Sequence, residues 1–328
     1  MNGILGKIKK AGIVGMGGAC FSTAAKWTMV QEAAGNKKYV VCNGSEGEPG
    51  VSKDEYILEH YPERVIDGMK IAIDFLQAEK GYLFLNYAYN KKLNKKLTAL
   101  MKDSKIEIFA KPVNSGYIGG EESALLNAIE GKRIEPRLKP PFPPVSGLWS
   151  CPTLINNVET FYNVSLANGG KYENKRFYTI TGDCPNEGVY ELSDNFTVEK
   201  ILNQTKNYPK FPFFVQVGGL ASGEFFNSSQ LKKPAGGAGS IAVFSMKKNN
   251  FKKIIKNSLN FFMNESCGQC VACREGTYRL NEVFSKEKID WDLFNRLLDD
   301  LSDASFCALG SSAPMAIRSL MKNAYNIK

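Results

Sequence analysis

Four cysteines near the C-terminal end constrain this chain more than any other feature. Cys267, Cys270 and Cys273 form a Cys-x2-Cys-x2-Cys run in ESCGQCVACREG, and Cys307 follows in SFCALG. Three thiolates at this interval can hold three corners of a cubane from one tight stretch of backbone, and a remote fourth thiolate can close it. The spacing therefore predicts a [4Fe-4S] cluster.

Two other uses of these thiols compete with a cluster. Zinc sites more often pair two separate Cys-x2-Cys knuckles, and the central cysteine would be redundant in that arrangement. A disulfide framework requires an oxidising compartment, and the compartment expected for this chain is reducing. The other cysteines are scattered, and we expect reduced, incidental thiols there: Cys20, Cys42, Cys151 and Cys184.

The residues around the clustered cysteines follow helical spacing. Apolar side chains recur at intervals of three and four residues, which is typical of amphipathic helices. We expect a C-terminal helical bundle whose loops carry the cluster, with helices near 251–266, 276–287, 290–302 and 312–325.

Composition excludes several other classes of protein. The chain has 328 residues, of which 43% are hydrophobic and 23% charged, as in soluble proteins of two or three domains. It lacks an apolar run of about 18 residues, so we expect no direct membrane span. His60 is the only histidine, which argues against a His-rich metal centre and against a Ser-His-Asp triad.

The formal net charge of +9 has two readings. It can be a solvated basic surface, or it can attract anions such as a nucleotide cofactor or an acidic protein. We expect no nucleic acid partner, because the lysine runs do not belong to a recognisable nucleic-acid-binding motif.

Residues 7–20 are only weakly similar to a lipoprotein signal, because the stretch before Cys20 is rich in glycine. We therefore expect a cytoplasmic protein, either free or peripheral to a membrane complex on its cytoplasmic side.

The N-terminal half predicts a ligand-binding α/β layer. Strands are expected at 39–42, 81–86 and 106–110, separated by helical patterns at 63–79 and 90–102. This alternation favours a doubly wound sheet. The first strand runs into NGSEGEPG, so polar groups stand at the carboxyl end of the sheet, where such folds bind ligands.

A glycine loop precedes that first strand. GIVGMGGACFSTAAKW holds Gly15, Gly17 and Gly18, whose amides could approach a phosphate or a flat ring. The loop does not fit a Rossmann fingerprint, and a plain flexible turn is an equal alternative. Further along, the KPPFPP segment cannot be a central strand, and we expect it to wrap across the surface or over a ligand.

Five motifs in this order resemble one family. GMGGACFSTAAKW, VCNGSEGEPG, YIGGEESALLNAIEGKRIEPRLKPPFPPVSGLW, TLINNVET and the cysteine motif are similar to the NADH-oxidising flavoprotein subunit of respiratory complex I. This family (51 kDa or NuoF type) includes diaphorase subunits of NAD-linked hydrogenases and formate dehydrogenases. The resemblance covers nearly the whole chain.

The resemblance implies three domains. These are a Rossmann-like FMN/NADH-binding domain at 1–168, a small β-grasp (SLBB-like) domain at 169–248 and a helical [4Fe-4S] domain at 249–328. The middle segment alternates in period two, as strands do. Its role is either an interaction module or a structural spacer between the flavin and cluster domains.

The resemblance also implies the cofactor residues. The FMN candidates are Gly15, Gly17, Lys26, Asn43, Tyr117, Gly120, Glu121, Asn156, Asn157 and Thr160. The candidates for binding NADH are Phe21, Glu48, Glu122, Lys139 and Phe142. The cluster ligands are Cys267, Cys270, Cys273 and Cys307. Glu48 and Glu122 would line the nicotinamide side and disfavour NADPH by repelling its extra phosphate.

The implied reaction converts a two-electron donor into single electrons. A hydride passes from NADH to FMN, and electrons then reach the [4Fe-4S] cluster one at a time. No protein acid or base is required, because the hydride moves between cofactors. The expected acceptors are a thioredoxin-like [2Fe-2S] subunit and further iron–sulfur subunits of a larger complex.

The sequence departs from the family at several positions around the cofactors. Met16, Cys20, Met29, Ser45 and Gly119 replace residues that members usually have, and these changes remove charge and a stacking surface. One hypothesis is therefore that this protein retains FMN but binds the dinucleotide more weakly or in an altered way. A competing hypothesis is an electron-transfer and docking subunit that has lost NAD binding and exchanges electrons with a ferredoxin-like partner.

Overall fold

The protein consists of two compact units in a computed structural model that describes residues 3–325. Unit 1 comprises residues 1–47 and 52–177, and unit 2 comprises residues 48–51 and 178–328. The short segment 48–51 is thus part of unit 2, although it lies within the N-terminal half of the sequence.

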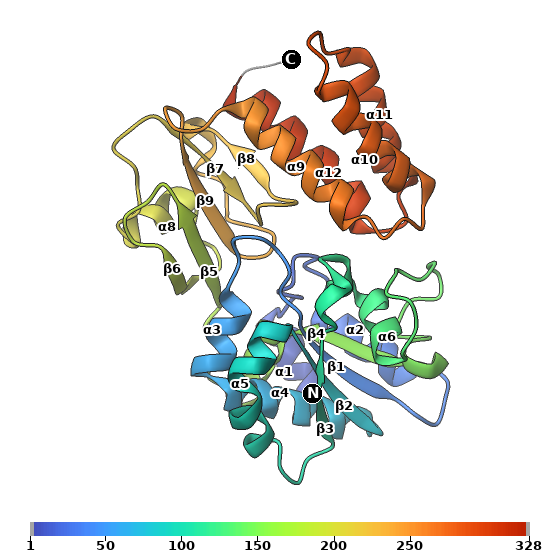
Figure 1. The fold of residues 1–328 in the computed structure, drawn as a ribbon. Coiled ribbons are helices and arrows are strands. Elements are labelled where there is room, and N and C mark those ends of the chain that lie inside the picture. The colour runs from blue at the N-terminus through green and yellow to red at the C-terminus, as the bar shows by residue number, and fades with distance from the viewer. Residues whose placement is uncertain (1–2, 326–328) are drawn as a thin grey trace. The chain divides into compact units, whose positions relative to one another are not determined.

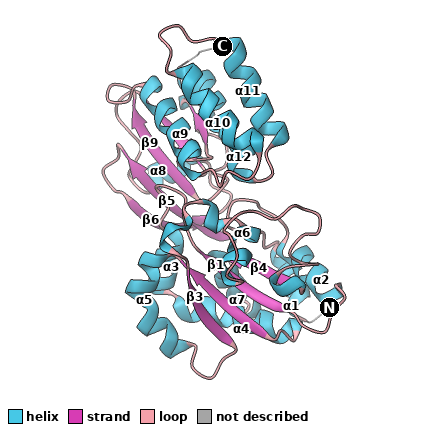
Figure 2. Ribbon diagram, turned by 45° about the vertical axis from the view of Figure 1, so that its right-hand side comes forward, coloured by secondary structure: helices cyan, strands magenta, loops and turns pink. Residues whose placement is uncertain are grey.

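Unit 1 contains a four-stranded parallel sheet (Figures 1 and 2). The strand order is β3-β2-β1-β4, with every neighbouring pair parallel. Chain order therefore reverses between β1 and β4, which creates a topological switch point. The strands are β1 (Tyr39–Gly44), β2 (Lys80–Leu85), β3 (Ile106–Ala110) and β4 (Thr153–Asn157).

The strands of this sheet carry apolar side chains on both faces. Helices therefore cover both faces of the sheet. Val41, Phe84 and Ile155 pack with Leu125 and Leu126 of the helix after β3. The helices of unit 1 are α1 (Ile4–Ala11), α2 (Thr23–Glu32), α3 (Lys53–His60), α4 (Pro62–Leu76), α5 (Tyr87–Leu100), α6 (Glu122–Ile129) and α7 (Val158–Asn168). Short 3-10 turns are η1 (Val113–Ser115), η2 (Ile118–Gly120) and η3 (Leu148–Ser150).

Helices α4 and α7 pack together at a glycine. A Cβ atom placed on Gly68 would lie 2.0 Å from the carbonyl oxygen of Phe161, so only glycine allows the two backbones to approach this closely. The approach fixes α7, whose first turn follows directly from the carboxyl end of β4.

Unit 2 contains a five-stranded mixed sheet in the order β6-β5-β9-β7-β8, and its strand β5 starts just before the boundary at residue 178. Strands β5 and β9 are parallel, whereas β7 is antiparallel to both β8 and β9. Helix α8 (Val198–Gln204) buries Val198, Ile201 and Leu202 against one face. The strands are β5 (Lys175–Gly182), β6 (Gly188–Ser193), β7 (Phe213–Val217), β8 (Glu224–Phe226) and β9 (Ser240–Ser245), and a short turn, η4 (Ser228–Gln230), follows β8.

The C-terminal helices of unit 2 pack on the opposite side of this sheet. Phe214, Phe225 and Phe244 form an aromatic group that includes Tyr325, and the Ser319 hydroxyl accepts a hydrogen bond of 2.9 Å from the Phe225 amide. The helices are α9 (Phe251–Glu265), α10 (Val271–Phe284), α11 (Trp291–Ala304), α12 (Ala308–Ser319) and a π-helical turn, η5 (Leu320–Ala324).

The predicted fold class is confirmed, with a parallel Rossmann-like sheet and C-terminal helices. The division at residues 168 and 248 remains a prediction, in which unit 2 would hold the second and third domains. Helix α10 starts at Val271, five residues before the expected start, because the cysteine run leads straight into it. Within residues 3–325, no helix has both the length and the apolar character needed to cross a membrane.

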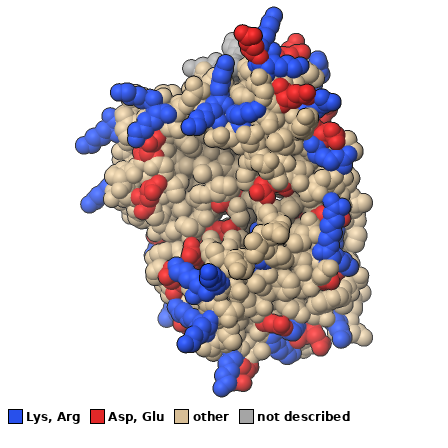
Figure 3. All heavy atoms as spheres, viewed as in Figure 1, with Lys and Arg blue, Asp and Glu red and all other residues tan. Residues whose placement is uncertain are grey.

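Charged side chains are distributed over the surface. In Figure 3, Lys and Arg occur at several places on the visible face, with Asp and Glu beside many of them. Lys92 pairs with Glu55 and Glu59, and Lys248 pairs with Asp183. These pairs agree with the interpretation of a solvated basic surface, although the net charge still favours anionic ligands.

Candidate functional site

The carboxyl ends of β1 and β4 meet at the switch point of unit 1. Asn43 and Asn157, the polar residues at the ends of these strands, lie opposite each other in the parallel pairing. The Asn157 amide donates to the carbonyl oxygen of Asn43 at 3.4 Å, and the Asn43 amide donates to that of Gly120 at 2.9 Å. The structure thus brings together three of the predicted FMN residues, from β1, η2 and β4.

The glycine loop of residues 12–22 is anchored at the same edge. A hydrogen bond of 2.8 Å within the loop joins the Gly15 amide to the Phe21 carbonyl. The Met16 amide donates to the Thr160 hydroxyl at 3.0 Å. A Cβ atom on Gly17 would lie 3.4 Å from the Cβ atom of Asn157, so the loop passes close to the end of β4.

Asn156 and Thr160 are buried, and both hold neighbouring parts of the site in place. The Asn156 side chain accepts a hydrogen bond of 3.0 Å from the Trp27 indole, which fixes α2. Thr160 fixes the glycine loop through Met16. The contacts favour a supporting role for these two predicted FMN residues.

A charged group forms where η2 leads into α6. The Lys139 ammonium lies 2.8 Å from the Glu121 carboxylate and 2.9 Å from that of Glu122. Glu122 also lies 3.6 Å from the Lys26 ammonium. Burial raises the pKa of Glu122, but the charges of Lys26 and Lys139 outweigh burial and hold its pKa below the ordinary value.

The other Glu of this turn, Glu121, is the N-cap of α6. Its carboxylate accepts hydrogen bonds from the Ser123 and Ala124 amides at 2.8 and 2.9 Å, so it is engaged with the helix start. A phosphate reaching Lys139 would have to compete with Glu121 and Glu122 for its ammonium group.

The predicted stacking residues are exposed. Phe21 ends the glycine loop and is 48% exposed, and Phe142 lies in the Pro-rich segment and is 49% exposed. An exposed aromatic ring offers a flat apolar face, so both residues are suited to stack on a flat ligand. Tyr117 lies beside the acidic turn, with its Cα atom 3.5 Å from a Cβ atom placed on Gly47.

Sequence reasoning missed Arg137, which holds the ends of the segment that carries Lys139 and Phe142. Its guanidinium group donates to the Gly147 carbonyl and to the Asn127 side chain, each at 2.8 Å, and pairs with Glu130 at 2.8 Å. An arginine within EPRLKPPFPP was visible in the sequence, but its long-range partners were not.

Glu48, the remaining predicted NADH residue, belongs to unit 2. Its carboxylate accepts a hydrogen bond of 2.8 Å from the Ala221 amide, in the turn between β7 and β8. A Cβ atom on Gly219 would lie 2.1 Å from the same carboxylate oxygen. Because Glu48 and Glu122 lie in different units, their shared role at the nicotinamide remains a prediction.

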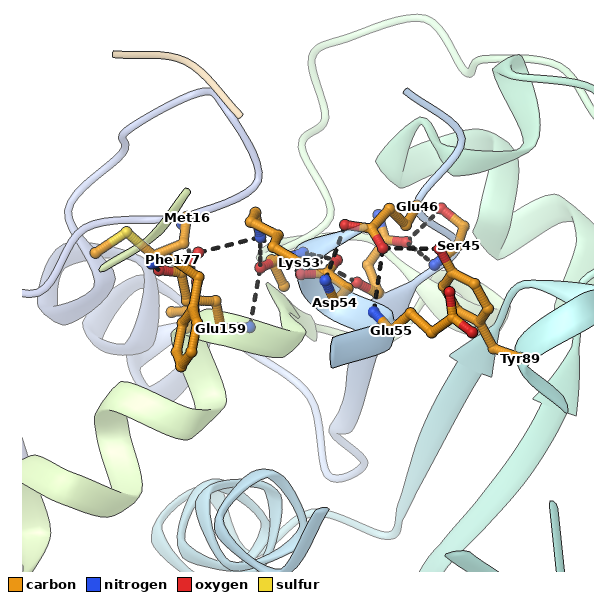
Figure 4. Close-up of polar contacts among 12 residues, drawn as sticks. Met16, Ser45, Glu46, Lys53, Asp54, Glu55, Tyr89, Glu159 and Phe177 are labelled. Atoms are coloured by element: carbon orange, nitrogen blue, oxygen red, sulfur yellow. Dashed lines mark hydrogen bonds and ion pairs between the residues drawn. The ribbon is translucent and has the colours of Figure 1, made fainter. Parts of the chain in front are cut away.

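A buried charge centre, also missed by sequence reasoning, lies beneath the switch point (Figure 4). The Lys53 ammonium, at the start of α3, lies 2.6 Å from the Asp54 carboxylate and 3.1 Å from the Glu159 carboxylate of α7. It also donates to the Asn157 side chain at 3.2 Å. Burial lowers the pKa of Lys53, but the charges of Asp54, Glu159 and Glu46 outweigh burial and raise it.

Glu46 joins this charge centre from the acidic turn. Its carboxylate accepts hydrogen bonds from the Asp54 and Glu55 amides at 2.9 and 3.1 Å and from the Tyr89 hydroxyl at 2.8 Å. Burial, followed by the charge of Asp54, raises the pKa of Glu46 to about 7 even though Lys53 opposes the shift. Several buried carboxylates share one ammonium, so binding a proton at Glu46 relieves their repulsion.

The four predicted cluster cysteines gather in unit 2. Cys270 and Cys273 are buried, and Cys267 and Cys307 are partly buried. Burial, together with the charges of Cys270, Cys307 and Cys267, raises the pKa of Cys273 to about 11, although a hydrogen bond with Ser266 opposes the shift. The other three cysteines are therefore near enough to Cys273 for their negative charge to disfavour its thiolate.

Among residues 3–325, no group of three His, Cys, Asp or Glu side chains is placed to hold a single metal ion. A cubane spreads its ligands farther apart than one ion does. Gly268 has a φ of +79°, in the left-handed region that permits the tight turn between Cys267 and Cys270. The donor set and this turn fit a cubic cluster that replaces thiol protons with iron.

Comparison with known proteins decides the family. The model of the Nuo51 FMN-binding domain matches residues 8–166, and that of the NADH-ubiquinone oxidoreductase-F iron-sulfur binding region matches residues 253–326. An F-type subunit of the NADH-quinone oxidoreductase of Rhizobium meliloti is 31% identical over 96% of this chain and 85% of its own length. The corresponding F-type protein of Escherichia coli is 34% identical over 83% of this chain and 70% of its own length.

The chain belongs to the family of F-type subunits of NADH-quinone oxidoreductase.

A hydrogenase subunit and a solved hydrogenase are also similar to this family member. The alpha subunit of the NAD-reducing hydrogenase HoxS of Cupriavidus necator is 32% identical over 92% of this chain. A chain of an NAD+-reducing [NiFe]-hydrogenase in the H2-reduced state superposes with a TM-score of 0.91 and 30% identity over 98% of this chain. This chain spans 56% and 61% of those two relatives, respectively. The predictions of the family, an FMN-binding domain and a [4Fe-4S] region are confirmed.

The departures from the usual family sequence are accommodated locally. Met16 is buried while its amide is bonded to Thr160, and the Ser45 hydroxyl donates to the Asn43 side chain at 2.8 Å. A Cβ atom on Gly119 would lie 2.8 Å from Ser115 and 2.9 Å from the Lys111 side chain, so a larger residue there would require these side chains to move. Met29 and Cys20 are exposed.

Replacing Lys53 tests the buried charge centre. We expect Lys53→Met to destabilise unit 1 by about 3–5 kcal/mol, because it leaves the carboxylates of Asp54 and Glu159 buried without their cation. The matched control, Lys92→Met, removes exposed ion pairs and should cost far less than Lys53→Met. Urea unfolding followed by tryptophan fluorescence measures both, since Trp27 and Trp149 lie in unit 1. Equal losses would contradict this account.

The raised pKa of Glu46 predicts a pH dependence of stability. Between the ordinary pKa of 4.5 and about 7, the folded state binds more protons at Glu46 than the unfolded state does. The free energy of unfolding should therefore fall as pH rises through this window. Glu46→Gln should flatten that part of the profile, whereas the exposed control Glu63→Gln should not. Thermal unfolding at several pH values provides the measurement, and identical slopes for Glu46→Gln and the parent protein would refute the prediction.

Proposed function

We propose that this chain is the electron-input subunit of a multi-subunit oxidoreductase, oxidising NADH at FMN and delivering electrons to a [4Fe-4S] cluster. FMN supplies hydride acceptance and single-electron release when bound, and the cluster supplies one-electron transfer. The observation that carries this proposal is the pairing, in one chain, of an FMN-binding match at 8–166 with an iron–sulfur match at 253–326.

The flavin contacts would come from the switch point of unit 1. The amides of the glycine loop around Gly15 and Gly17 are suited to carbonyl or phosphate oxygens. Asn43 and Asn157 border the same edge, and Lys26 supplies a positive charge that opposes the negative charge of a phosphate. The segment around η2 would close the site with Tyr117, Gly120 and Glu121. Asn156 would support it through α2, and Thr160 through the glycine loop.

The dinucleotide would lie between exposed groups that these elements present. Phe21 and Phe142 provide stacking surfaces, and Lys139 a cation for phosphate. Glu122 stays ionised because Lys26 and Lys139 lower its pKa, so it opposes the extra phosphate of NADPH. Glu48 would add a second carboxylate on the nicotinamide side. No acid or base of this chain is needed for the transfer.

NADH remains the proposed donor despite the departures from the family pattern. The changes at Met16 and Ser45 leave the glycine loop and Asn43 held by hydrogen bonds, and both stacking rings are present. The relatives named as NADH-quinone oxidoreductase and NAD-reducing hydrogenase subunits also support an NAD-linked role. The alternative subunit without NAD binding is therefore not favoured.

The cluster would pass its electrons to another protein. We propose a thioredoxin-like [2Fe-2S] subunit as a partner, followed by further iron–sulfur subunits. The relatives are themselves named as subunits of larger enzymes, which supports this assignment. The proposed location is cytoplasmic, either free or peripheral to a membrane complex on its cytoplasmic side.

An anaerobic titration with NADH tests the proposed function. Protein loaded with FMN and iron should lose its flavin absorbance on addition of NADH and then show a reduced cluster by electron paramagnetic resonance. Cys307→Ala should keep flavin bleaching but lose the cluster signal, whereas the control Cys184→Ala should keep both. A visible flavin that NADH leaves unchanged would reject NADH as the donor, and zinc in place of iron would reject the cluster.

Removing a stacking ring should weaken NADH binding without affecting the cluster. We expect Phe142→Ala to weaken binding about three- to tenfold, because a stacked ring contributes about 0.5–1.5 kcal/mol beyond its burial. Phe211 is a suitable control, since it is a similarly exposed phenylalanine beside prolines in unit 2. Equilibrium binding of NADH measures both variants, and equal affinities for Phe142→Ala and Phe211→Ala would remove Phe142 from the site.

A further inference from the structure

Two serine hydroxyls border the most buried of the four clustered cysteines. The Ser266 hydroxyl oxygen lies 3.4 Å from the Cys273 sulfur atom. The same oxygen accepts a hydrogen bond of 3.4 Å from the Gly268 amide, in the turn between Cys267 and Cys270. Since the Gly268 amide occupies a lone pair of this oxygen, the Ser266 proton can be directed at the sulfur.

The second hydroxyl, that of Ser305, is buried and has no hydrogen-bond partner within residues 3–325. A Cβ atom placed on Gly310 would lie 2.3 Å from the Ser305 hydroxyl oxygen and 3.2 Å from the Cys273 Cβ atom. Both side chains therefore border the small space left by this glycine. A buried hydroxyl without a partner is costly, and this one lies across the space left by Gly310 from the Cys273 side chain.

Two neighbouring hydroxyls differ from these. The Thr277 hydroxyl donates to the Cys273 carbonyl at 2.7 Å, and the Ser311 hydroxyl donates to the Cys307 carbonyl at 3.3 Å. Their protons are already used by backbone oxygens. Of these four hydroxyls, only those of Ser266 and Ser305 do not donate to a backbone oxygen in the part of the chain that the structure describes, so their protons are available to sulfur.

We propose that Ser266 and Ser305 donate hydrogen bonds to sulfur on the Cys273 side of the cluster and thereby raise its reduction potential. This inference rests on the proposed function, because it requires the cluster. Sulfur ligated to iron bears negative charge, and one added electron increases that charge. A hydrogen bond to sulfur therefore stabilises the reduced state more than the oxidised state. The two serines act through the cluster and are not ligands of iron.

The test is a potentiometric titration of the holoprotein monitored by electron paramagnetic resonance. Ser266→Ala and Ser305→Ala should each shift the midpoint potential to more negative values. A tenfold change in the reduction equilibrium corresponds to about 59 mV for a one-electron couple. Ser311→Ala is the matched control and should leave the potential unchanged. Midpoints for both serine variants that equal that of the parent protein would overturn the proposal.

A second pair of variants separates tuning from cluster assembly. Ser266→Thr and Ser266→Val have nearly the same shape, and only the first keeps the hydroxyl. The first should have the more positive potential at equal iron content, and equal potentials would overturn the proposal. Loss of iron from Ser266→Val but not from Ser266→Thr would also overturn the proposal, because the hydroxyl would then be needed for cluster assembly. Parent protein without a [4Fe-4S] cluster would instead refute the proposed function.

Discussion

The buried ammonium group of Lys53 is the interaction on which the site in unit 1 depends. It joins the start of α3 to Glu159 of α7 and to Asn157 at the end of β4. Asp54, beside it in sequence, accepts a hydrogen bond of 2.6 Å from the Asn157 amide. Helix α3 follows β1 and α7 follows β4, so these contacts hold the two sides of the switch point together.

Other parts of the site rely on this arrangement. The first turn of α7 presents Thr160 to the glycine loop, and Asn157 lies against Gly17. A buried ion pair gains little net stability, because removing its charges from water costs about as much as their attraction returns. This ion pair instead selects one arrangement of α3, α7 and β4, because any other arrangement would leave charges buried without partners. Burial at this centre, followed by the charge of Asp54, also raises the pKa of Glu46.

Sequence patterns predicted the cluster cysteines and many of the helices and strands, because these features depend on residues that are close together in the sequence. The spacing of Cys267, Cys270 and Cys273 reflects one turn of backbone, and the apolar periods reflect single helices. The residues that were missed act over long distances. Lys53 and Arg137 look like ordinary surface cations, and only folding shows that the first meets Glu159 and the second spans Asn127 and Gly147. Pairing of β4 with β1, which creates the switch point, is likewise invisible locally.

We propose that the flavin binds at the edge held by Lys53. The experiment that tests this proposal is a crystal structure of the anaerobically purified protein with FMN. We expect the flavin outside the carboxyl ends of β1 and β4, within hydrogen-bond distance of the glycine-loop amides, with Lys53 still buried against Asp54 and Glu159. Flavin bound elsewhere in the protein, or a Lys53 side chain turned toward solvent beside it, would contradict the account.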